Sequence, residues 1–475
     1  MALPRLSFCV DIRFMMRRSI GVATDLYELT MAAAYFEQGM TQRAVFELFI
    51  RSLPQNRSFL ITAGLDQALE YLESLRFTAD EIGYLKSHPA FENISGEFFE
   101  YLREFRFTGD VWAMAEGTAA FGMEPILRVE APLIEAQVVE TYLLSTITFQ
   151  TLIATKAARI NIAAGGKDIV DFGTRRAHGP EAGLLAARAS YIGGCLGTSN
   201  VEAGLLFNIP TFGTLAHSFI MSFEAEEEAF RAFLASFPHS ATLLVDTYDT
   251  INAVEMICEK FGGPESNIAA VRLDSGDLVD LSKRTRALLD AAGMTSTTIF
   301  ASGDLNEEKI ADLLARGAAI DAFGVGTELV TSYDSPALGG VYKLAATEVN
   351  GLAVPRMKLS GGKTTYPGAK QVWRLTNQHE EYERDIIALT SESEPDVGGL
   401  RPRPLLEPVM KDGRIQGSDS ANPLIAARER AKGELARLPK PLLELDCKHG
   451  YPVMISSLLE KKRGELSEKL IANRM

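Results

Sequence analysis

The sequence predicts an α/β protein with two kinds of domain, because strand-like and helix-like patterns change character along the chain. Residues 21–140 mix short strands, turns and helices, as in an α+β domain. Residues 141–345 alternate short apolar runs with amphipathic helices, which is typical of a barrel of parallel strands. Residues 346–475 return to strands and loops and end in a helix that begins near Ser456. We therefore expect an α/β barrel domain and an α+β domain built from both chain ends.

The first residues of the chain, 1–20, lie outside both predicted domains. Their apolar stretch is interrupted by Asp11 and Arg13, and basic residues follow it rather than precede it, unlike a signal peptide. We expect a disordered extension, or translation that begins at Met15 or Met16.

The first regular element is a helix near the start of the α+β domain. Asp25 is a possible N-cap, Glu28 would complete a capping box three residues later, and Gly39 would end the helix. Residues 45–50, VFELFI, have the alternation of a strand, and residues 65–75 have the spacing of a helix.

The barrel domain is predicted from continuous apolar runs, as expected for parallel strands that are buried on both faces. The runs are 169–173, 209–213, 242–246, 268–274, 298–303 and 319–326. The helices expected between them are 224–236, 249–261, 277–291 and 306–315. Nearly every run ends in a polar stretch with glycine, and in a barrel such strand ends share one rim, where active sites lie.

Composition and charge exclude several classes of function. The chain has 475 residues, a formal net charge of −14 and 46% hydrophobic residues, which favours a soluble protein and argues against a nucleic-acid surface. No apolar run is long enough for a membrane helix. The four cysteines form no C-x-x-C pair and the six histidines no H-E-x-x-H motif. We therefore expect reduced thiols in the cytoplasm and no zinc site.

Two strand ends with glycine have residues suited to phosphates and a sugar. In Phe323-Gly-Val-Gly-Thr327 the glycines let backbone N–H groups approach a phosphate, although a mere tight turn has the same pattern. Arg272-Leu-Asp-Ser-Gly-Asp277 combines an arginine with acids, which suits a polyanion bound with Mg²⁺. In this motif Asp274 or Asp277 would contact metal or ribose hydroxyls, and an internal salt-bridge cluster is the alternative.

Two further strand ends carry arginines or a histidine. Arg175 and Arg176 directly follow a predicted buried strand, where adjacent guanidinium groups suit a diphosphate, and exposed surface charge is the alternative. His178 beside them is ambiguous. Thr214 and His217 follow the next predicted strand, where an imidazole can act as a base, an acid or a phosphoryl acceptor.

Taken together, these motifs resemble those of the nicotinate phosphoribosyltransferases, which are type II phosphoribosyltransferases. The similarity extends from Thr24-Asp-Leu-Tyr27 through FGTRRAHG, GTSN, GTLAHS, VDTYDT, RLDSGD, FGVGT and LGGVYKL to PRMKLS and TYPGAK. It covers roughly residues 24–375 in order and leaves out the first residues and the polar stretch 376–400. The resemblance implies an irregular, incomplete TIM-like barrel beside the α+β domain, and a homodimer.

The resemblance also implies roles for individual residues. His217 would be the histidine that ATP phosphorylates, and Arg175 and Asp274 would also be catalytic. The implied nicotinate contacts are Tyr27, which would reach the partner's site, and Phe172, Thr214, Arg272 and Ser199. The implied contacts to phosphoribosyl diphosphate are Thr327, Gly324, Gly326, Gly303, Asp304, Arg176, Ser275, Gly276 and Asp277.

The implied reaction joins nicotinate to 5-phosphoribosyl 1-diphosphate with consumption of ATP and water, and forms nicotinate mononucleotide for NAD biosynthesis. Mg²⁺ is expected to bind mainly through the substrate phosphates. Nicotinamide phosphoribosyltransferase is the nearest alternative, and Ser199 argues against it because the amide-using enzymes carry an aspartate at this position. A barrel lyase or aldolase would need a Schiff-base lysine on a strand, which none of the predicted strands contains. In a non-enzymatic binding protein, the Arg, Asp and His residues predicted at the rim would have no role.

Overall fold

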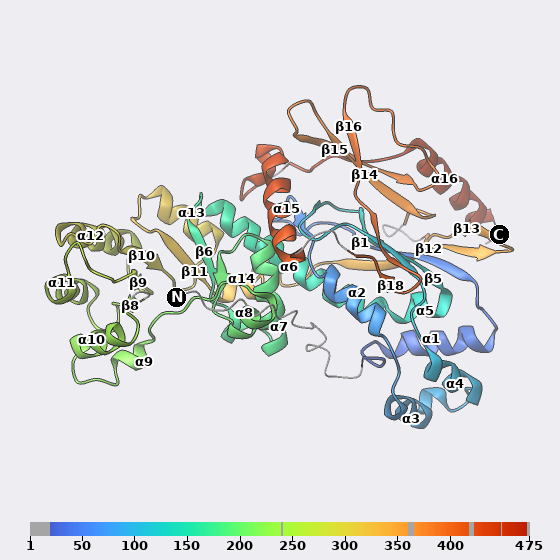
Figure 1. The fold of residues 1–475 in the computed structure, drawn as a ribbon. Helices are drawn as coiled ribbons and strands as arrows, with labels where there is room; N and C mark the ends of the chain where they lie inside the picture. The colour runs from blue at the N-terminus through green and yellow to red at the C-terminus, as the bar shows by residue number, and fades with distance from the viewer. Residues whose placement is uncertain (1–19, 239–240, 360–364, 418–421, 448, 473–475) are drawn as a thin grey trace. The chain divides into compact units, whose positions relative to one another are not determined.

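The computed structural model describes residues 20–472, without 239–240, 360–364, 418–421 and 448. The extension predicted over 1–20 therefore lies almost wholly outside the described residues. The chain divides into two compact units. The first unit is Met1–Thr151 with Ala337–Met475, and the second is Leu152–Pro336. Figure 1 shows the elements of each.

The first unit is built on mainly antiparallel sheets. A seven-stranded sheet has the order β13-β12-β1-β5-β3-β17-β18, and a four-stranded sheet has the order β16-β14-β15-β19. The strands of the larger sheet are β1 (Arg43–Ile50), β3 (Asp110–Ala113), β5 (Pro125–Pro132), β12 (Gly340–Val349), β13 (Leu352–Pro355), β17 (Glu407–Lys411) and β18 (Arg414–Ile415). Those of the smaller sheet are β14 (Lys370–Thr376), β15 (Tyr382–Leu389), β16 (Arg401–Pro404) and β19 (Val453–Ile455). A separate pair joins β2 (Leu60–Ile61) to β4 (Ala119–Ala120).

The helices of the first unit are α1 (Leu26–Glu37), α2 (Leu65–Ser74), α3 (Ala79–Ser87), α4 (Gly96–Glu104), α5 (Leu133–Val138), α15 (Pro423–Arg437) and α16 (Ser457–Ala472), with short 3-10 turns at Pro89–Phe91 and Lys440–Leu443. Helices α2 and α16 and strand β1 confirm the elements predicted there.

The capping box predicted for α1 is wrong. Glu28 is fully buried and accepts a hydrogen bond from Gln137 Nε2 at 2.6 Å, and Asp25 accepts one from Thr141 Oγ1 at 2.9 Å. These tertiary partners replace the local bonds of a capping box. Gly39, in the left-handed region with φ 63°, follows the end of the helix as predicted.

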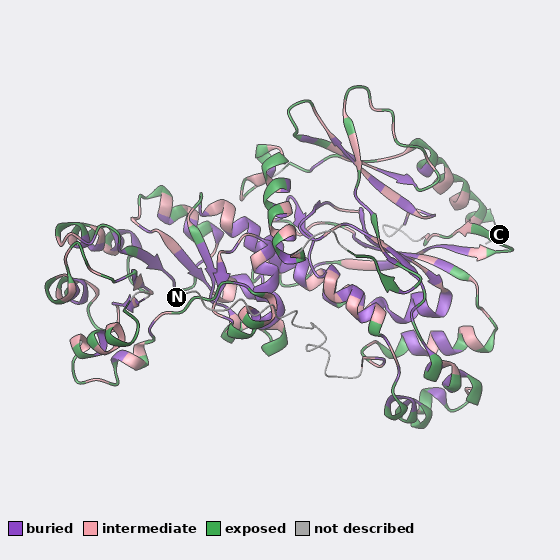
Figure 2. Cartoon of the chain, in the orientation of Figure 1, coloured by how far each residue is buried: buried purple, intermediate pink, exposed green. Residues whose placement is uncertain are grey.

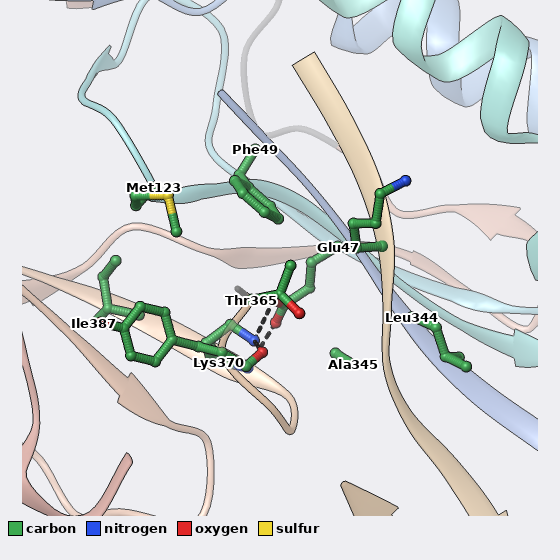
Figure 3. Close-up of a pocket in the computed structure, with 10 residues that line it drawn as sticks. Glu47, Phe49, Met123, Leu344, Ala345, Thr365, Lys370 and Ile387 are labelled. Carbon is green, nitrogen blue, oxygen red and sulfur yellow. Dashed lines mark hydrogen bonds and ion pairs between the residues drawn. The ribbon is translucent and has the colours of Figure 1, made fainter. Parts of the chain in front are cut away.

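A buried ion pair ties the C-terminal part of this unit to its N-terminal part. Lys370 Nζ on β14 lies 2.6 Å from Glu47 Oε2 on β1. The pair lines a small cavity together with Phe49, Met123 and Thr365 (Figure 3). Because the two charges satisfy each other, the pair has a structural role in joining the two ends of the chain.

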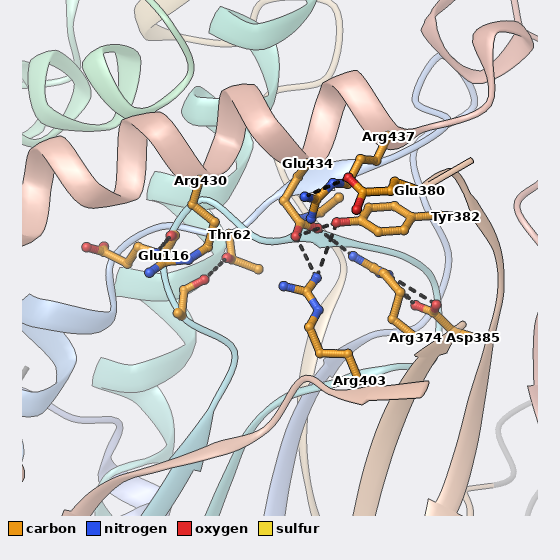
Figure 4. A network of polar contacts seen from close by, with 12 residues as sticks. Thr62, Glu116, Arg374, Glu380, Tyr382, Asp385, Arg403, Arg430, Glu434 and Arg437 are labelled. Carbon is orange, nitrogen blue, oxygen red and sulfur yellow. Dashed lines mark hydrogen bonds and ion pairs between the residues drawn. The ribbon is translucent and has the colours of Figure 1, made fainter. Parts of the chain in front are cut away.

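A fully buried arginine organises the four-stranded sheet. Arg374 on β14 pairs with Asp385 on β15 at 2.6 Å and with Glu434 on α15 at 2.7 Å (Figure 4). Tyr382 and Arg403 also donate to Glu434, at 2.8 and 2.6 Å. The several donors compensate the burial of these carboxylates, and the network fastens α15 to the sheet.

The second unit contains a curled, six-stranded parallel sheet with the order β7-β6-β11-β10-β9-β8, which is an incomplete barrel. Its strands are β6 (Asp168–Asp171), β7 (Gly197–Thr198), β8 (Thr242–Leu244), β9 (Ala270–Leu273), β10 (Thr298–Ala301) and β11 (Ala322–Val325). Its helices are α7 (Pro180–Ile192), α8 (Val201–Phe207), α9 (His217–Ile220), α10 (Glu226–Ser236), α11 (Thr250–Phe261), α12 (Leu278–Ala291), α13 (Glu307–Ala315) and α14 (Thr327–Val330), with a 3-10 turn at Thr174–Arg176. Helix α6 (Glu140–Ala163) crosses the boundary between the units. The predicted fold class is confirmed.

The strand predicted at 209–213 is wrong. Within this segment only Thr211 pairs with the sheet, through a single bridge to Thr198. The edge strand of the sheet is instead the short β7, Gly197–Thr198. Pro210 has no N–H to donate to a ladder, so this segment touches the sheet without extending it.

The strands of the second unit bury an apolar core, which explains their continuous apolar runs. Leu243, Val271, Ile299 and Phe323 are fully buried, each from a different strand. Figure 2 shows these strands as buried, while the surrounding helices α10–α12 keep exposed faces. The polar residues that follow the strands therefore stand at the edge of a rigid sheet.

Candidate active site

A connected group of polar side chains in the second unit centres on Arg272, near the end of β9. Its Nε donates to Ser302 Oγ at 2.7 Å, Nη1 donates to Thr214 Oγ1 at 2.7 Å, and Nη2 pairs with Asp274 Oδ1 at 2.6 Å. These partners come from three different loops, and the Arg272 side chain is 11% exposed. The terminal nitrogens each keep a further N–H, so the fixed guanidinium can still bind an anion.

Asp274 is held as a carboxylate by the same group. Burial would raise its pKa, but the hydrogen bond from Ser302 and the charge of Arg272 lower the pKa below the ordinary value, and His217 contributes in the same direction. Ser302 is almost fully buried, accepts from Arg272 and donates to Asp274. The site thus holds a fixed cation beside a fixed anion.

A second carboxylate, that of Asp246, lies one strand away, after β8. Its Oδ2 accepts from Ser275 Oγ at 2.6 Å and from the backbone N–H of Asp274 at 3.2 Å. Its buried Oδ1 has no hydrogen-bond partner among the described residues. That oxygen is therefore suited to a ribose hydroxyl or to a cation brought by a substrate.

His217 begins the short helix α9 and is half-buried. Its Nδ1 lies 3.1 Å from Thr247 Oγ1, the residue next to Asp246. A hydroxyl at Nδ1 orients the ring and leaves Nε2 for chemistry.

Two mostly buried aromatic rings lie beside the arginine. The Arg272 guanidinium carbon is 5.6 Å from the ring centroid of Phe172, whose ring centroid is 5.3 Å from that of Phe300. A side chain on Gly324 would meet Phe172 at 2.6 Å and Phe300 at 2.8 Å. Gly324 is therefore required by the packing of these rings. Gly326 has no such close neighbour and precedes Thr327, the first residue of α14.

The remaining predicted phosphate and ribose residues lie on loops that follow β6, β9 and β10. Arg175 and Arg176 are exposed in the 3-10 turn after β6. Gly303 and Asp304 both have positive φ, of 95° and 43°, and a side chain on Gly303 would meet the Asp274 carbonyl oxygen at 2.1 Å.

Two members of the RLDSGD motif have local roles. Gly276 has φ 86°, as a tight turn requires. The Asp277 carboxylate caps α12 by accepting from the N–H groups of Val279 and Asp280. This side chain is therefore engaged with the helix.

The predicted nicotinate residues belong to both units. Thr214, Arg272 and Phe172 lie together in the second unit, and Ser199 follows β7 there. Tyr27 lies on α1 of the first unit with 48% of its side chain exposed, and its contact to the ring stays a prediction. Burial raises the pKa of its hydroxyl, as do the carboxylates of Glu28 and Glu140, so Tyr27 is protonated at neutral pH.

Sequence reasoning missed Ser302, Asp246, Thr247 and Asp171. Each is a small polar residue at or beside the end of a parallel strand, and this position was one available signal. Asp246 and Thr247 also belong to the VDTYDT motif, which was a second signal. The roles of these four residues depend on partners from neighbouring strands, such as the bond between Ser302 and Arg272, 30 residues apart in sequence.

Two features are absent from the described part of the chain. No helix in it is long and apolar enough to cross a membrane. In the same residues, no group of three or more His, Cys, Asp or Glu side chains could hold a metal ion by itself.

Comparison with known proteins points to one family. Residues 22–148 match the family model for the N-terminal domain of nicotinate phosphoribosyltransferase (NAPRTase), and residues 168–360 match the NAPRTase family model. Nicotinate phosphoribosyltransferase pncB2 of Mycobacterium tuberculosis is 46% identical over 444 residues, which cover 93% of this chain and 92% of that protein. Nicotinate phosphoribosyltransferase of Bacillus subtilis is 46% identical over 392 residues, which cover 81% of this chain and 79% of that protein.

Solved structures agree with these relatives. Human nicotinic acid phosphoribosyltransferase superposes with a TM-score of 0.80 at 29% identity, over 93% of this chain and 99% of that chain. A nicotinate-nucleotide pyrophosphorylase from Pyrococcus furiosus has the same fold, with a TM-score of 0.71 at 24% identity, over 92% of this chain and 99% of that chain.

Proposed function

Because the chain belongs to the nicotinate phosphoribosyltransferase family, we propose that it makes nicotinate mononucleotide for NAD biosynthesis. The substrates are nicotinate and 5-phosphoribosyl 1-diphosphate, and ATP and water are converted to ADP and phosphate in the same cycle. Diphosphate is the other product. The proposal places the enzyme in the cytoplasm.

The observation that carries this proposal is the guanidinium of Arg272 beside the face of Phe172. Nicotinate is a flat aromatic ring with one carboxylate, so its ring can stack near Phe172 while its carboxylate accepts from the free N–H groups of Arg272. Thr214, already bonded to Arg272, adds a hydroxyl at the same place. A sugar-phosphate enzyme would need no aromatic face here.

The transfer step needs positioning and charge neutralisation more than proton transfer. The bond from the anomeric carbon to diphosphate breaks, and the nicotinate ring nitrogen forms the new bond to that carbon. Arg175 and Arg176 on the exposed turn after β6 would neutralise the leaving diphosphate. The loop of Gly326 and Thr327 would hold the 5-phosphate, and Asp274 or Asp304 a ribose hydroxyl.

The proposed role of ATP runs through His217. Nε2 would attack the γ-phosphate, so that an N–P bond forms and ADP leaves, and water would later hydrolyse the phosphohistidine. Thr247 at Nδ1 supports this role because it orients the ring. Coupling of ATP hydrolysis to the transfer requires that the enzyme with phosphorylated His217 and the enzyme with free His217 bind substrates and products with different free energies.

The residues present fit a magnesium ion that arrives with the substrate. Mg²⁺ keeps several waters and takes one or two carboxylates plus substrate phosphates. The Asp246 oxygen that has no partner among the described residues lies near Asp274 and could be one of these carboxylate ligands. When bound, the ion would neutralise phosphate charge.

The proposal includes a homodimer in which Tyr27 of one subunit completes the ring site of the other. The exposure of this large aromatic side chain on α1 supports it.

The test is diphosphate release with nicotinate, with nicotinamide and without a pyridine substrate, each with and without ATP. We expect release to depend on nicotinate and to increase with ATP. Release that depends on nicotinamide instead would contradict the assignment. Release without either ring would indicate hydrolysis of the sugar diphosphate.

A further inference from the structure

A buried carboxylate lies behind the proposed ring site. Asp171 ends β6 directly before Phe172, and its side chain is 0% exposed. The described partners of its carboxylate are neutral: the backbone N–H of Gly173 at 2.8 Å and the hydroxyl of Thr198 at 2.7 Å. A buried carboxylate without a cation costs stability, and burial raises its pKa to about 6.

These bonds connect two loops of the site. The bond to Gly173 holds the turn that carries Phe172, and the bond to Thr198 reaches the neighbouring strand β7. The backbone carbonyl of Asp171 also accepts from the N–H of Ser199 at 2.8 Å. Asp171 is thus bonded to the residues that directly follow β6 and to residues at the end of β7.

The chain of bonds continues beyond Thr198. Its hydroxyl oxygen accepts from the N–H of Asn200 at 3.0 Å, and Asn200 in turn caps α8 by accepting from Ala203. Thr198 itself is fully buried. The Thr198 hydroxyl donates to Asp171, because an ionised carboxylate can only accept, and its oxygen accepts from the backbone at the same time.

We propose that Asp171, through Thr198, is a positioning residue that sets the choice between an acid and an amide substrate, by fixing Phe172 and Ser199 relative to Arg272. The inference rests on the proposed function. If the nicotinate ring is displaced, its carboxylate loses the charge-assisted contact to Arg272. Nicotinamide, which has no carboxylate, loses less binding free energy from the same displacement. A merely structural Asp171 would affect stability and leave this choice unchanged.

The experiment compares Thr198→Val with Thr198→Ser. The valine has the same shape but no hydroxyl, whereas the serine keeps the hydroxyl and restores the bond to Asp171. Thr285→Val is the matched control, because Thr285 is fully buried in the same unit and its hydroxyl has no partner among the described residues. Asp171→Asn tests the other side of the bond. The carboxylate accepts from both Gly173 and Thr198, so the NH₂ group of an asparagine would face one of these two donors in either orientation of the amide.

The measurements are kcat and KM for nicotinate and nicotinamide, binding of nicotinate by calorimetry, and Tm. We expect Thr198→Val and Asp171→Asn to narrow the ratio of kcat/KM for acid over amide by about tenfold, mainly through KM for nicotinate. Thr198→Ser and Thr285→Val should keep the wild-type ratio.

A lower Tm with an unchanged ratio in both Thr198→Val and Asp171→Asn would overturn the inference. If Thr198→Val does not fold, the ratio in Asp171→Asn decides alone. Wild-type protein that neither binds nor converts nicotinate would overturn the proposed function together with this inference. A wild type that prefers nicotinate, with variants that keep the preference, would overturn this inference alone.

Discussion

Replacing Arg272 by lysine tests whether the shape of the guanidinium, rather than its charge, recognises the substrate. Arg272 has one bond from each nitrogen, to Ser302, Thr214 and Asp274, and this arrangement directs its remaining N–H groups. Lysine keeps the positive charge, but a single ammonium cannot reproduce a planar fork with several fixed partners. The charge beside Asp274 is retained, so this carboxylate stays ionised.

The magnitude follows from the hydrogen bonds that the fork makes. A carboxylate can accept in parallel from both terminal nitrogens of Arg272, and lysine would replace this pair by one contact. The loss of one charge-assisted hydrogen bond is about 1.5–3 kcal/mol, or about one to two decades in affinity. We expect Arg272→Lys to raise KM for nicotinate by this factor and to change the kinetics with nicotinamide much less.

The assay is steady-state diphosphate release with both substrates, together with Tm. Arg284→Lys is the control, because its guanidinium makes an exposed contact of 3.5 Å to Asp280 on α12. Such a pair contributes at most ~1 kcal/mol to stability and should leave kinetics unchanged. If Arg272→Lys folds and keeps the wild-type ratio of kcat/KM for the two substrates, the guanidinium does not contact the carboxylate and the reasoning fails.

The other predictions concern ATP coupling, the dimer, the amide choice and pH. His217→Ala should fold but take up no label from the γ-phosphate of ATP, and labelling equal to wild type would remove this histidine from the mechanism. Tyr27→Ala mixed with Arg272→Ala should regain activity in heterodimers, and no recovery after verified subunit exchange would argue for a site within one chain. Ser199→Asp should narrow the preference for nicotinate by weakening the acid, and an unchanged ratio would mean that residue 199 does not face the ring. Burial raises the pKa of Asp171 from 3.8 to about 6, so the folded protein binds a proton at Asp171 more tightly than the unfolded chain does. The contribution of this protonated side chain to the free energy of unfolding is full below about pH 4 and is lost as the pH rises through 6. Between these values the free energy of unfolding should fall by about 3 kcal/mol relative to Asp171→Asn, and parallel curves would contradict this.

Several features of the fold were predictable from local sequence, because they depend on the periodicity of apolar residues. The parallel strands β6 and β8–β11 and helices α10–α13 lie where apolar runs and amphipathic patterns indicated them. The failure at 209–213 has a local cause, since Pro210 interrupts any ladder that its apolar neighbours suggest. The rim motifs were also visible, because glycines and charged residues directly after buried strands are conspicuous in sequence.

What only the tertiary structure decided is which side chains meet. Glu28 has the spacing of a capping residue, yet it bonds Gln137, 109 residues away. Arg272 has its partners on loops 30 and 58 residues away, and Asp171 bonds Thr198 across β6 and β7. Strand periodicity states that a segment is buried, but contacts across the rim depend on the order in which strands pair, here β10-β9-β8 and β7-β6. That order is set by packing of the whole unit, so the environment of Arg272 and the role of Asp171 could not be obtained from sequence spacing.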